Sequence, residues 1–175
     1  MTKQELAECI GQYGSDVYAF CRHLAGNMQE ADELYQDTWL KMVELSGRID
    51  AAGNVKSYCL SVALKLWNNR RRKYAWRRRI AGVREDFEGE GLGEIPDGGL
   101  SLDECLLEQN RDRQVRQAVR ELPDKLKAVV LLYYMEGLSV AQTAEAAGIS
   151  AGTVKSRLHQ ARKLLKKKLE GVLNE

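Results

Sequence analysis

A strongly basic segment near the C-terminus has the residue types and spacing of a helix that reads DNA. Seven Lys/Arg and no Asp/Glu lie between Lys155 and Lys168. On a helix that turns about 100° per residue, these cations flank short polar side chains on the side opposite an apolar stripe. Cations neutralise phosphates, and short polar groups reach base edges in the major groove. The alternative is an amphipathic helix with a solvated basic face. The predicted DNA contacts are Thr153, Lys155, Ser156, Arg157, His159, Gln160 and Arg162.

The residues in front of this helix form a predicted tight turn, and the turn favours the DNA interpretation. Residues 139–147 read as a short helix, and Gly148 can take the positive φ that ends it. Ser150 suits the N-cap of the second helix. The second helix then presents an apolar stripe made of Val154, Leu158, Ala161 and Leu165. This spacing predicts a helix-turn-helix.

A second basic segment, residues 65–79, mixes cations with aromatic side chains. It holds eight Lys/Arg and no Asp/Glu, with Trp67, Tyr74 and Trp76 between them. Every nucleobase offers a face for stacking and every nucleotide a phosphate to neutralise. The mixture therefore favours nucleic-acid contact over a charged face that is only solvated.

The elements that must position both surfaces are all predicted to be helices. The chain is 44% hydrophobic and 30% charged, it has only 2 prolines, and no segment alternates like a strand. We expect Gly11 and Gly14 to interrupt the chain between the first two helices. We expect the run Val129–Tyr134 to form the core of the C-terminal part. The predicted helices cover residues 2–10, 16–24, 28–45, 55–79, 102–121, 125–136, 139–147 and 151–169.

An acidic stretch separates the two basic segments. Residues 85–104 contain eight Asp/Glu and no Lys/Arg, together with several glycines and Pro96. Such a segment cannot build a core, so it predicts a flexible acidic linker. The predicted fold class is all-α, with two small helical domains, residues 1–80 and 102–175, joined by a linker over residues 81–101.

Nothing in the sequence points to catalysis. The four cysteines form no C-x-x-C pair, and no phosphate-binding glycine loop or metalloprotease motif occurs. We therefore expect no enzyme activity, no cofactor, no metal site, and reduced thiols that are mostly buried. No apolar run is long enough for a membrane span, and the N-terminus lacks an apolar signal region. We expect a cytoplasmic protein without membrane insertion.

The order of the motifs resembles the RNA polymerase sigma factors of the extracytoplasmic-function (ECF) group. The N-terminal match is Glu30-Ala-Asp-Glu-Leu-Tyr-Gln-Asp-Thr-Trp-Leu40, and it continues in Val55-Lys-Ser-Tyr-Cys-Leu60. The C-terminal match is Glu121-Leu-Pro123, Glu136-Gly-Leu-Ser139 and Gly148-Ile-Ser-Ala-Gly-Thr-Val-Lys-Ser-Arg-Leu158. Together these motifs span nearly the whole chain except the acidic stretch.

The resemblance implies two domains, which the family calls regions two and four. The first would bind the polymerase clamp and read the downstream (minus ten) promoter element, with an extruded base held by the loop of residues 48–57. The second would read the upstream (minus thirty-five) element. The implied partners are core RNA polymerase, promoter DNA and an anti-sigma protein. Carried over by position, the polymerase-binding residues are Asp32, Glu33, Gln36 and Asp37. The residues implied for the downstream element are Asn54, Lys56, Ser57, Lys65, Trp67, Asn68, Asn69 and Arg72.

Two other functions fit part of the sequence. An ordinary helix-turn-helix regulator with an N-terminal sensing or dimerisation domain explains residues 138–169 equally well. It leaves the basic and aromatic segment 65–79 unexplained. A pure interaction module, such as a sequestering partner of another regulator, leaves both basic surfaces without a role. Promoter-specific initiation with core polymerase distinguishes a sigma factor from both.

The length of the acidic linker adds a physical condition to the sigma-factor interpretation. A coil of about 25 residues spans roughly 25–30 Å. Two promoter elements about two helical turns apart are separated by roughly 70 Å. A coil alone does not hold two domains that far apart. A larger partner such as the polymerase must hold the two domains at this separation.

Overall fold

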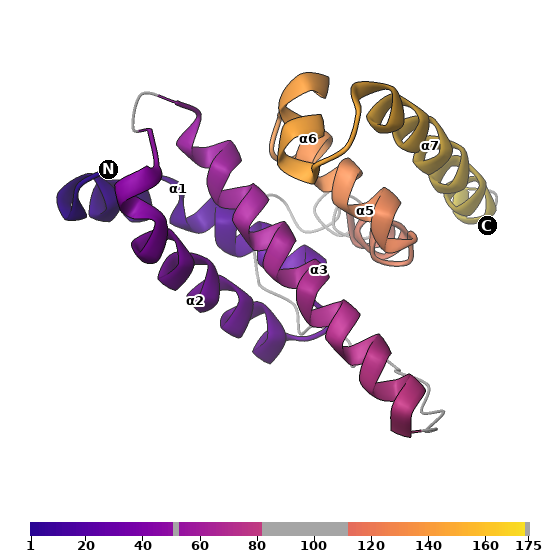
Figure 1. Ribbon diagram of the computed structural model, residues 1–175. Coiled ribbons are helices and arrows are strands. Elements are labelled where there is room, and N and C mark those ends of the chain that lie inside the picture. The colour runs from indigo at the N-terminus through magenta and orange to yellow at the C-terminus, as the bar shows by residue number, and fades with distance from the viewer. Residues whose placement is uncertain (51–52, 82–111, 174–175) are drawn as a thin grey trace, which may run out of the picture.

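The computed structural model describes residues 1–50, 53–81 and 112–173, and all regular elements among them are helical (Figure 1). The all-α prediction is confirmed. The acidic stretch and residues 102–111 of the predicted helix lie outside the described residues. The elements are α1 (Lys3–Leu24), α2 (Met28–Leu45), η1 (Ser46–Arg48), α3 (Val55–Ala81), helical residues 112–120, α5 (Asp124–Val130), the π-helical turn η2 (Leu131–Met135), α6 (Val140–Ala147) and α7 (Ala151–Leu173).

Helices α1, α2 and α3 form the N-terminal half, residues 1–81. Figure 1 shows α1 and α2 on one side of α3, with α5 and α6 on its other side. The side chains of Phe20, Leu34, Met42 and Leu60 are fully buried among the three helices. Leu34 and Met42 thus form part of the inward face of α2. Burying such side chains supplies about 1.5–3 kcal/mol each and is the main driving force for this bundle.

The predicted interruption at the two N-terminal glycines is wrong. Helix α1 runs unbroken through Gly11 and Gly14. A capping box between Thr2 and Glu5 starts it, and Leu6, Val17 and Phe20 lie on its buried face. A Cβ atom at Gly14 would lie 3.1 Å from the Tyr35 hydroxyl oxygen. Glycine at this position therefore allows α1 and α2 to approach closely, and tertiary packing outweighs its poor helix propensity.

The C-terminal half, residues 112–173, contains the predicted helix-turn-helix. Ser139 and Gln142 form a capping box at the start of α6, and Gly148 ends α6 with φ of 65°. The Ser150 hydroxyl accepts a 3.1 Å hydrogen bond from the Thr153 amide at the start of α7. The apolar core of this half consists of Leu122, Leu126, Val129, Val130, Ala144, Val154, Leu158 and Ala161.

The two halves are packed against each other through α3. Leu131, Leu132, Leu138 and Ala146 of the C-terminal half belong to the same buried cluster as the core of the N-terminal half. The run Val129–Tyr134 was predicted to be the core of the C-terminal part alone, and this prediction is corrected. Its apolar side chains pack in two directions, toward α7 and toward α3, and Tyr134 is 53% exposed.

Three cysteines lie among the described residues, and all three are free thiols. Cys21 and Cys59 are buried, and burial raises the pKa of both thiols to about 12. Such thiols are poor nucleophiles at neutral pH, because the thiolate is the reactive form. No described helix combines the length and the apolar character needed to span a lipid bilayer.

Candidate polymerase and nucleic-acid interfaces

The polar residues predicted to bind polymerase lie along one side of α2, which we call the α2 acidic surface (Asp32, Glu33, Gln36 and Asp37). Gln36 is exposed to solvent. The Asp32 carboxylate accepts a 2.8 Å hydrogen bond from the Tyr18 hydroxyl, and this bond raises the pKa of Tyr18. The side chains of Glu33 and Asp37 are 53% and 46% exposed, so their carboxylates are open to an approaching partner.

Arg70 of α3 lies beside this surface and already pairs with two of its acids. Its guanidinium is 2.5 Å from an Asp37 oxygen and 3.6 Å from a Glu33 oxygen. The N-terminal half thus supplies its own cation to the surface. Exposed pairs of this kind contribute about 0–1 kcal/mol each, so a competing basic partner can displace Arg70 at small cost.

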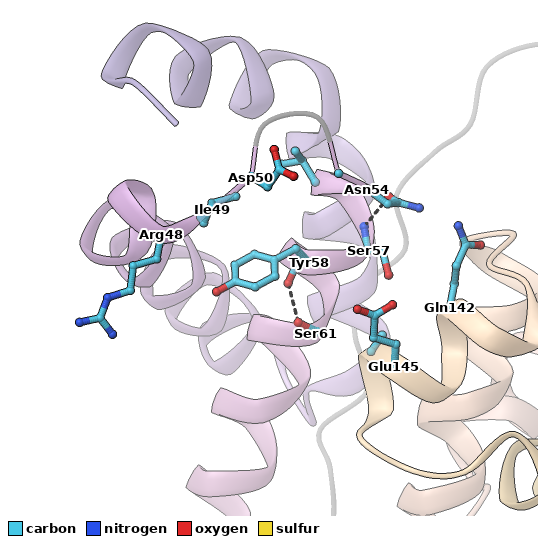
Figure 2. A pocket seen from close by; sticks show the side chains of 12 residues that line it. Arg48, Ile49, Asp50, Asn54, Ser57, Tyr58, Ser61, Gln142 and Glu145 are labelled. Carbon is cyan, nitrogen blue, oxygen red and sulfur yellow. Dashed lines mark hydrogen bonds between the residues drawn. The ribbon is translucent and has the colours of Figure 1, made fainter.

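The N-terminal end of α3 positions the first residues predicted for the downstream element. Asn54 is exposed and caps the helix, because its side-chain oxygen accepts a 2.9 Å hydrogen bond from the Ser57 amide. Ser57 was predicted to contact DNA, and both Ser57 and Ser61 are only 7% exposed. Helix α6 of the other half faces them (Figure 2). Contact between the halves buries both serines in this arrangement, and the DNA contact of Ser57 stays a prediction.

Further along α3, the polar residues predicted for DNA reach solvent, whereas the aromatic one does not. Lys65, Asn68, Asn69 and Arg72 are exposed. Trp67 is only 6% exposed, and the Arg71 guanidinium lies 5.0 Å from its ring centre. In this arrangement the Trp67 ring is part of the core and not available for stacking on a base. The exposed aromatic side chains of the basic segment are Tyr74 and Trp76.

A pocket of about 270 Å³ lies where the loop of residues 48–57 meets α3. This loop was predicted to hold an extruded base. Figure 2 shows the pocket between the loop and α3 on one side and α6 on the other. Gln142, Glu145 and Ala146 of α6 supply the second wall. The predicted base-binding loop therefore adjoins a carboxylate from the other half of the chain.

Lys56, predicted to contact DNA, is held by two acids. Its ammonium lies 2.7 Å from Asp16 of α1 and 3.0 Å from Glu136 of the C-terminal half. Burial acts to lower the pKa of Lys56, but the two hydrogen-bonded acids together raise it. For Glu136, burial raises the pKa, and Lys56 only partly offsets this. Glu136 is the more desolvated member of the pair, because its side chain is 3% exposed while that of Lys56 is 23% exposed.

The residues predicted for the upstream element lie on the open side of α7. Their cationic and hydrogen-bonding side chains are exposed or half-buried, and the stripe of Val154, Leu158 and Ala161 is buried underneath. Helix α7 packs on α5 and α6, away from α3 (Figure 1). The whole predicted set occupies the part of the α7 surface that the buried stripe leaves open: Thr153, Lys155, Ser156, Arg157, His159, Gln160 and Arg162.

The sequence did not identify the residues that join the halves. These are Glu136 and Asp124 of the C-terminal half, which pair with Lys56 of α3 at 3.0 Å and with Arg71 of α3 at 2.5 Å. Each of these acids is remote in sequence from the cation that it meets. No local spacing rule connects such positions, so no signal in a single sequence could have found them.

Comparison with protein families assigns both halves. The family model described as Sigma-70 region 2 matches residues 9–77, and the model described as Sigma-70, region 4 matches residues 112–165. The region 2 match includes α2 and the basic part of α3. It excludes the alternative of an ordinary helix-turn-helix regulator, which assigns a sensing or dimerisation domain to this half.

Relatives and solved structures agree with these matches. The ECF RNA polymerase sigma factor SigW of Bacillus subtilis (strain 168) is 26% identical over 170 residues, covering 93% of this chain and 88% of SigW. The RNA polymerase sigma-E factor of Streptomyces antibioticus is 41% identical over 78 residues, covering 44% of this chain and 42% of that protein.

The fold also matches a solved structure of the sigma factor RpoE in complex with the anti-sigma factor NepR from Bartonella quintana. The TM-score is 0.77 at 22% identity, covering 94% of this chain and 96% of that one. The structure of CnrH in complex with the cytosolic domain of CnrY gives a TM-score of 0.65 at 16% identity, covering 97% and 90%. With both regions matched in order, the chain belongs to the RNA polymerase sigma factors of the sigma-70 family, in their extracytoplasmic-function group.

Proposed function

We propose that this sigma factor directs promoter-specific initiation through three surfaces on three separate helices. The α2 acidic surface binds the polymerase clamp. The start and the exposed basic side of α3 hold the melted downstream element. The open face of α7 reads the upstream element. The observation that carries the proposal is that α3 and residues 151–169 of α7 each expose a cationic face without carboxylates of its own, and a promoter has two elements to contact.

The deciding experiment is run-off transcription. Core polymerase, supplied with the full chain, should initiate at defined positions on fragments from a genomic library. Core polymerase alone and the chain alone serve as controls, and neither should give discrete run-off products. Initiation that does not depend on the chain would refute the proposal.

We also propose an anti-sigma protein as a partner and a cytoplasmic location. Two of the similar folds were solved as complexes of this kind, RpoE with NepR and CnrH with CnrY. The exposed apolar side chains of Leu40 and Val43 on α2, 63% and 52% exposed, give a protein partner apolar area beside the α2 acidic surface. Co-purification of the native chain with a protein that blocks run-off transcription tests this partner.

Base-reading and phosphate-binding residues of α7 should differ in their effect on promoter choice. We predict that Ser156, His159 and Gln160 reach base edges and that Lys155, Arg157 and Arg162 contact phosphates. Gln160→Ala should weaken use of particular promoters by about 1–3 kcal/mol and change their ranking. Lys155→Ala should weaken all promoters alike and reduce the salt dependence of binding. Both variants are measured across one promoter library by run-off transcription.

The two positions form a matched pair, because both side chains are exposed on the same helix and neither packs in the core. Loss of fold therefore does not account for a difference between them. Identical promoter profiles for Gln160→Ala and Lys155→Ala would show that the proposed division is wrong.

A further inference from the structure

The last two turns of α3 carry exposed apolar and cationic side chains beyond the residues predicted for the downstream element. Trp76 is 63% exposed, and Ile80, about one turn further along the helix, is 67% exposed. Arg77, Arg78 and Arg79 are exposed between them. Figure 1 shows this end of α3 projecting beyond α2 and α5. Large apolar side chains that neighbour each other in solvent and are rimmed by polar groups are typical of an interaction site.

Two of these side chains lie on the face of α3 that is proposed to bind DNA. At a turn of about 100° per residue, Trp76 and Arg79 fall within the arc of about 100° that contains the exposed residues predicted for the downstream element, Lys65, Asn68, Asn69 and Arg72. Tyr74 and Arg78 lie on the opposite side, where the Arg78 guanidinium is 5.9 Å from the Tyr74 ring centre. The DNA face of α3 therefore continues past Arg72 and includes Trp76.

The length of this extension corresponds to a few base pairs. At 1.5 Å per residue, Arg79 lies about 10 Å beyond Arg72 along the helix axis. B-DNA rises by about 3.4 Å per base pair, so the extension spans about three base pairs. The loop proposed to hold an extruded base precedes α3, whereas the half proposed to read the upstream element follows it in the chain. The C-terminal end of α3 is therefore expected to point upstream.

We propose that Trp76 and Arg79 bind the double-stranded DNA immediately upstream of the melted element. The Arg79 guanidinium neutralises a backbone phosphate, and the Trp76 indole packs against the sugar or base edge beside it. Charge favours DNA as the occupant, because residues 72–79 include five Lys/Arg and no Asp/Glu. Continuity with the basic side of α3 favours it too. The inference rests on the proposed function, since it extends the surface that holds the downstream element.

Two DNA probes that differ only in this duplex test the proposal. Both carry the single-stranded downstream element of a promoter fragment recovered by run-off transcription, and neither includes the upstream element. One probe keeps about six base pairs of duplex upstream of the melted element, which is twice the proposed reach, and the other ends at the element. Core polymerase with the full chain is titrated against each labelled probe. The parent should bind the longer probe about tenfold or more tightly than the shorter one.

Variants of the two residues should remove this preference. Trp76→Ala and Arg79→Gln should each weaken binding to the longer probe by about three- to tenfold and leave the shorter probe within about twofold. Arg79→Gln should also lower the slope of log affinity against log salt by about one, because a phosphate contact is lost, whereas Trp76→Ala should not. Trp76→Phe keeps an aromatic surface and should restore most of the affinity.

Arg78→Gln is the matched control. It removes the same charge from the opposite side of α3, and it should leave both affinities and the salt slope close to those of the parent. The side chains at all three positions, 76, 78 and 79, are exposed, so these changes should not alter the fold. An effect of Arg78→Gln equal to that of Arg79→Gln would show that only overall charge matters, and it would overturn the assignment of one face to DNA.

The two probes also separate this inference from the proposed function. Equal weakening of both probes by Trp76→Ala and Arg79→Gln would place these residues on the melted strand and overturn the upstream contact. Unchanged binding of both probes would overturn it as well, and would leave this end of α3 to another occupant, such as an acidic protein. Failure of the parent chain to bind either probe or to give run-off products would refute the proposed function instead, because binding of the shorter probe does not depend on the extension.

Discussion

Asp37→Arg is expected to weaken binding to core polymerase by about 2–5 kcal/mol, which is roughly a 30-fold to several-thousand-fold loss of affinity. The change places a cation in the α2 acidic surface, where a basic polymerase surface is proposed to dock. It also sets two guanidinium groups side by side, since Arg70 contacts Asp37 in the free chain. The loss of this half-exposed pair alters stability by about 0–1 kcal/mol, so the fold should persist. Titration of the labelled chain with core polymerase measures the affinity.

Glu44→Arg is the matched control. Glu44 lies on α2, its side chain is 63% exposed, and among the described residues its ion pair is local, with Lys41 at 2.6 Å. Reversing its charge should leave core binding within a few-fold of the parent. A second variant, Arg70→Ala, tests whether Asp37 merely holds Arg70. If so, Arg70→Ala and Asp37→Ala would weaken core binding equally. That result would contradict a direct contact between Asp37 and the polymerase clamp.

Local sequence rules predicted most helices of this fold but missed the continuity of α1. The apolar stripe of α7, the helix end at Gly148 and the N-cap at Ser150 agree with the structure. Gly14 was interpreted as a break, because glycine weakens an isolated helix. Its lack of a side chain instead admits the Tyr35 hydroxyl. A propensity rule treats a glycine as a local feature and has no information about the partner that it accommodates.

The candidate DNA residues were predictable on α7 and less so on α3. One face of α7 is buried and the other is open, so a single periodicity separates the two. Helix α3 lies between α1 and α2 on one side and α6 on the other (Figure 1). Burial on two sides places Ser57 and Trp67 in contact with protein, although both were predicted to face DNA. Contacts between segments that are distant in sequence determine whether these side chains are buried. The periodicity of apolar residues carries no information about such contacts.

Leu158→Ala is expected to destabilise the C-terminal half by about 2–5 kcal/mol, because it leaves a cavity beneath the DNA-reading face. Leu158 is 4% exposed and packs in the cluster that joins α7 to α5 and α6. Without this anchor, α7 should lose its fixed orientation, and recognition of the upstream element should fall at all promoters. Urea unfolding followed by circular dichroism measures stability. Hydrogen exchange at the amides of α6 and α7 shows whether the loss is confined to this half.

Leu164→Ala on the same helix is the control, since Leu164 is 38% exposed. The same truncation there should change stability by about 0.5 kcal/mol or less, and it should leave exchange in α6 unaltered. The two leucines differ mainly in burial, so their difference measures how strongly the core positions the DNA-reading face. Equal loss of stability at both positions would contradict the assignment of one buried and one open side to α7. Normal promoter use by a Leu158→Ala chain with fast exchange in α7 would show that upstream recognition does not need a rigid helix.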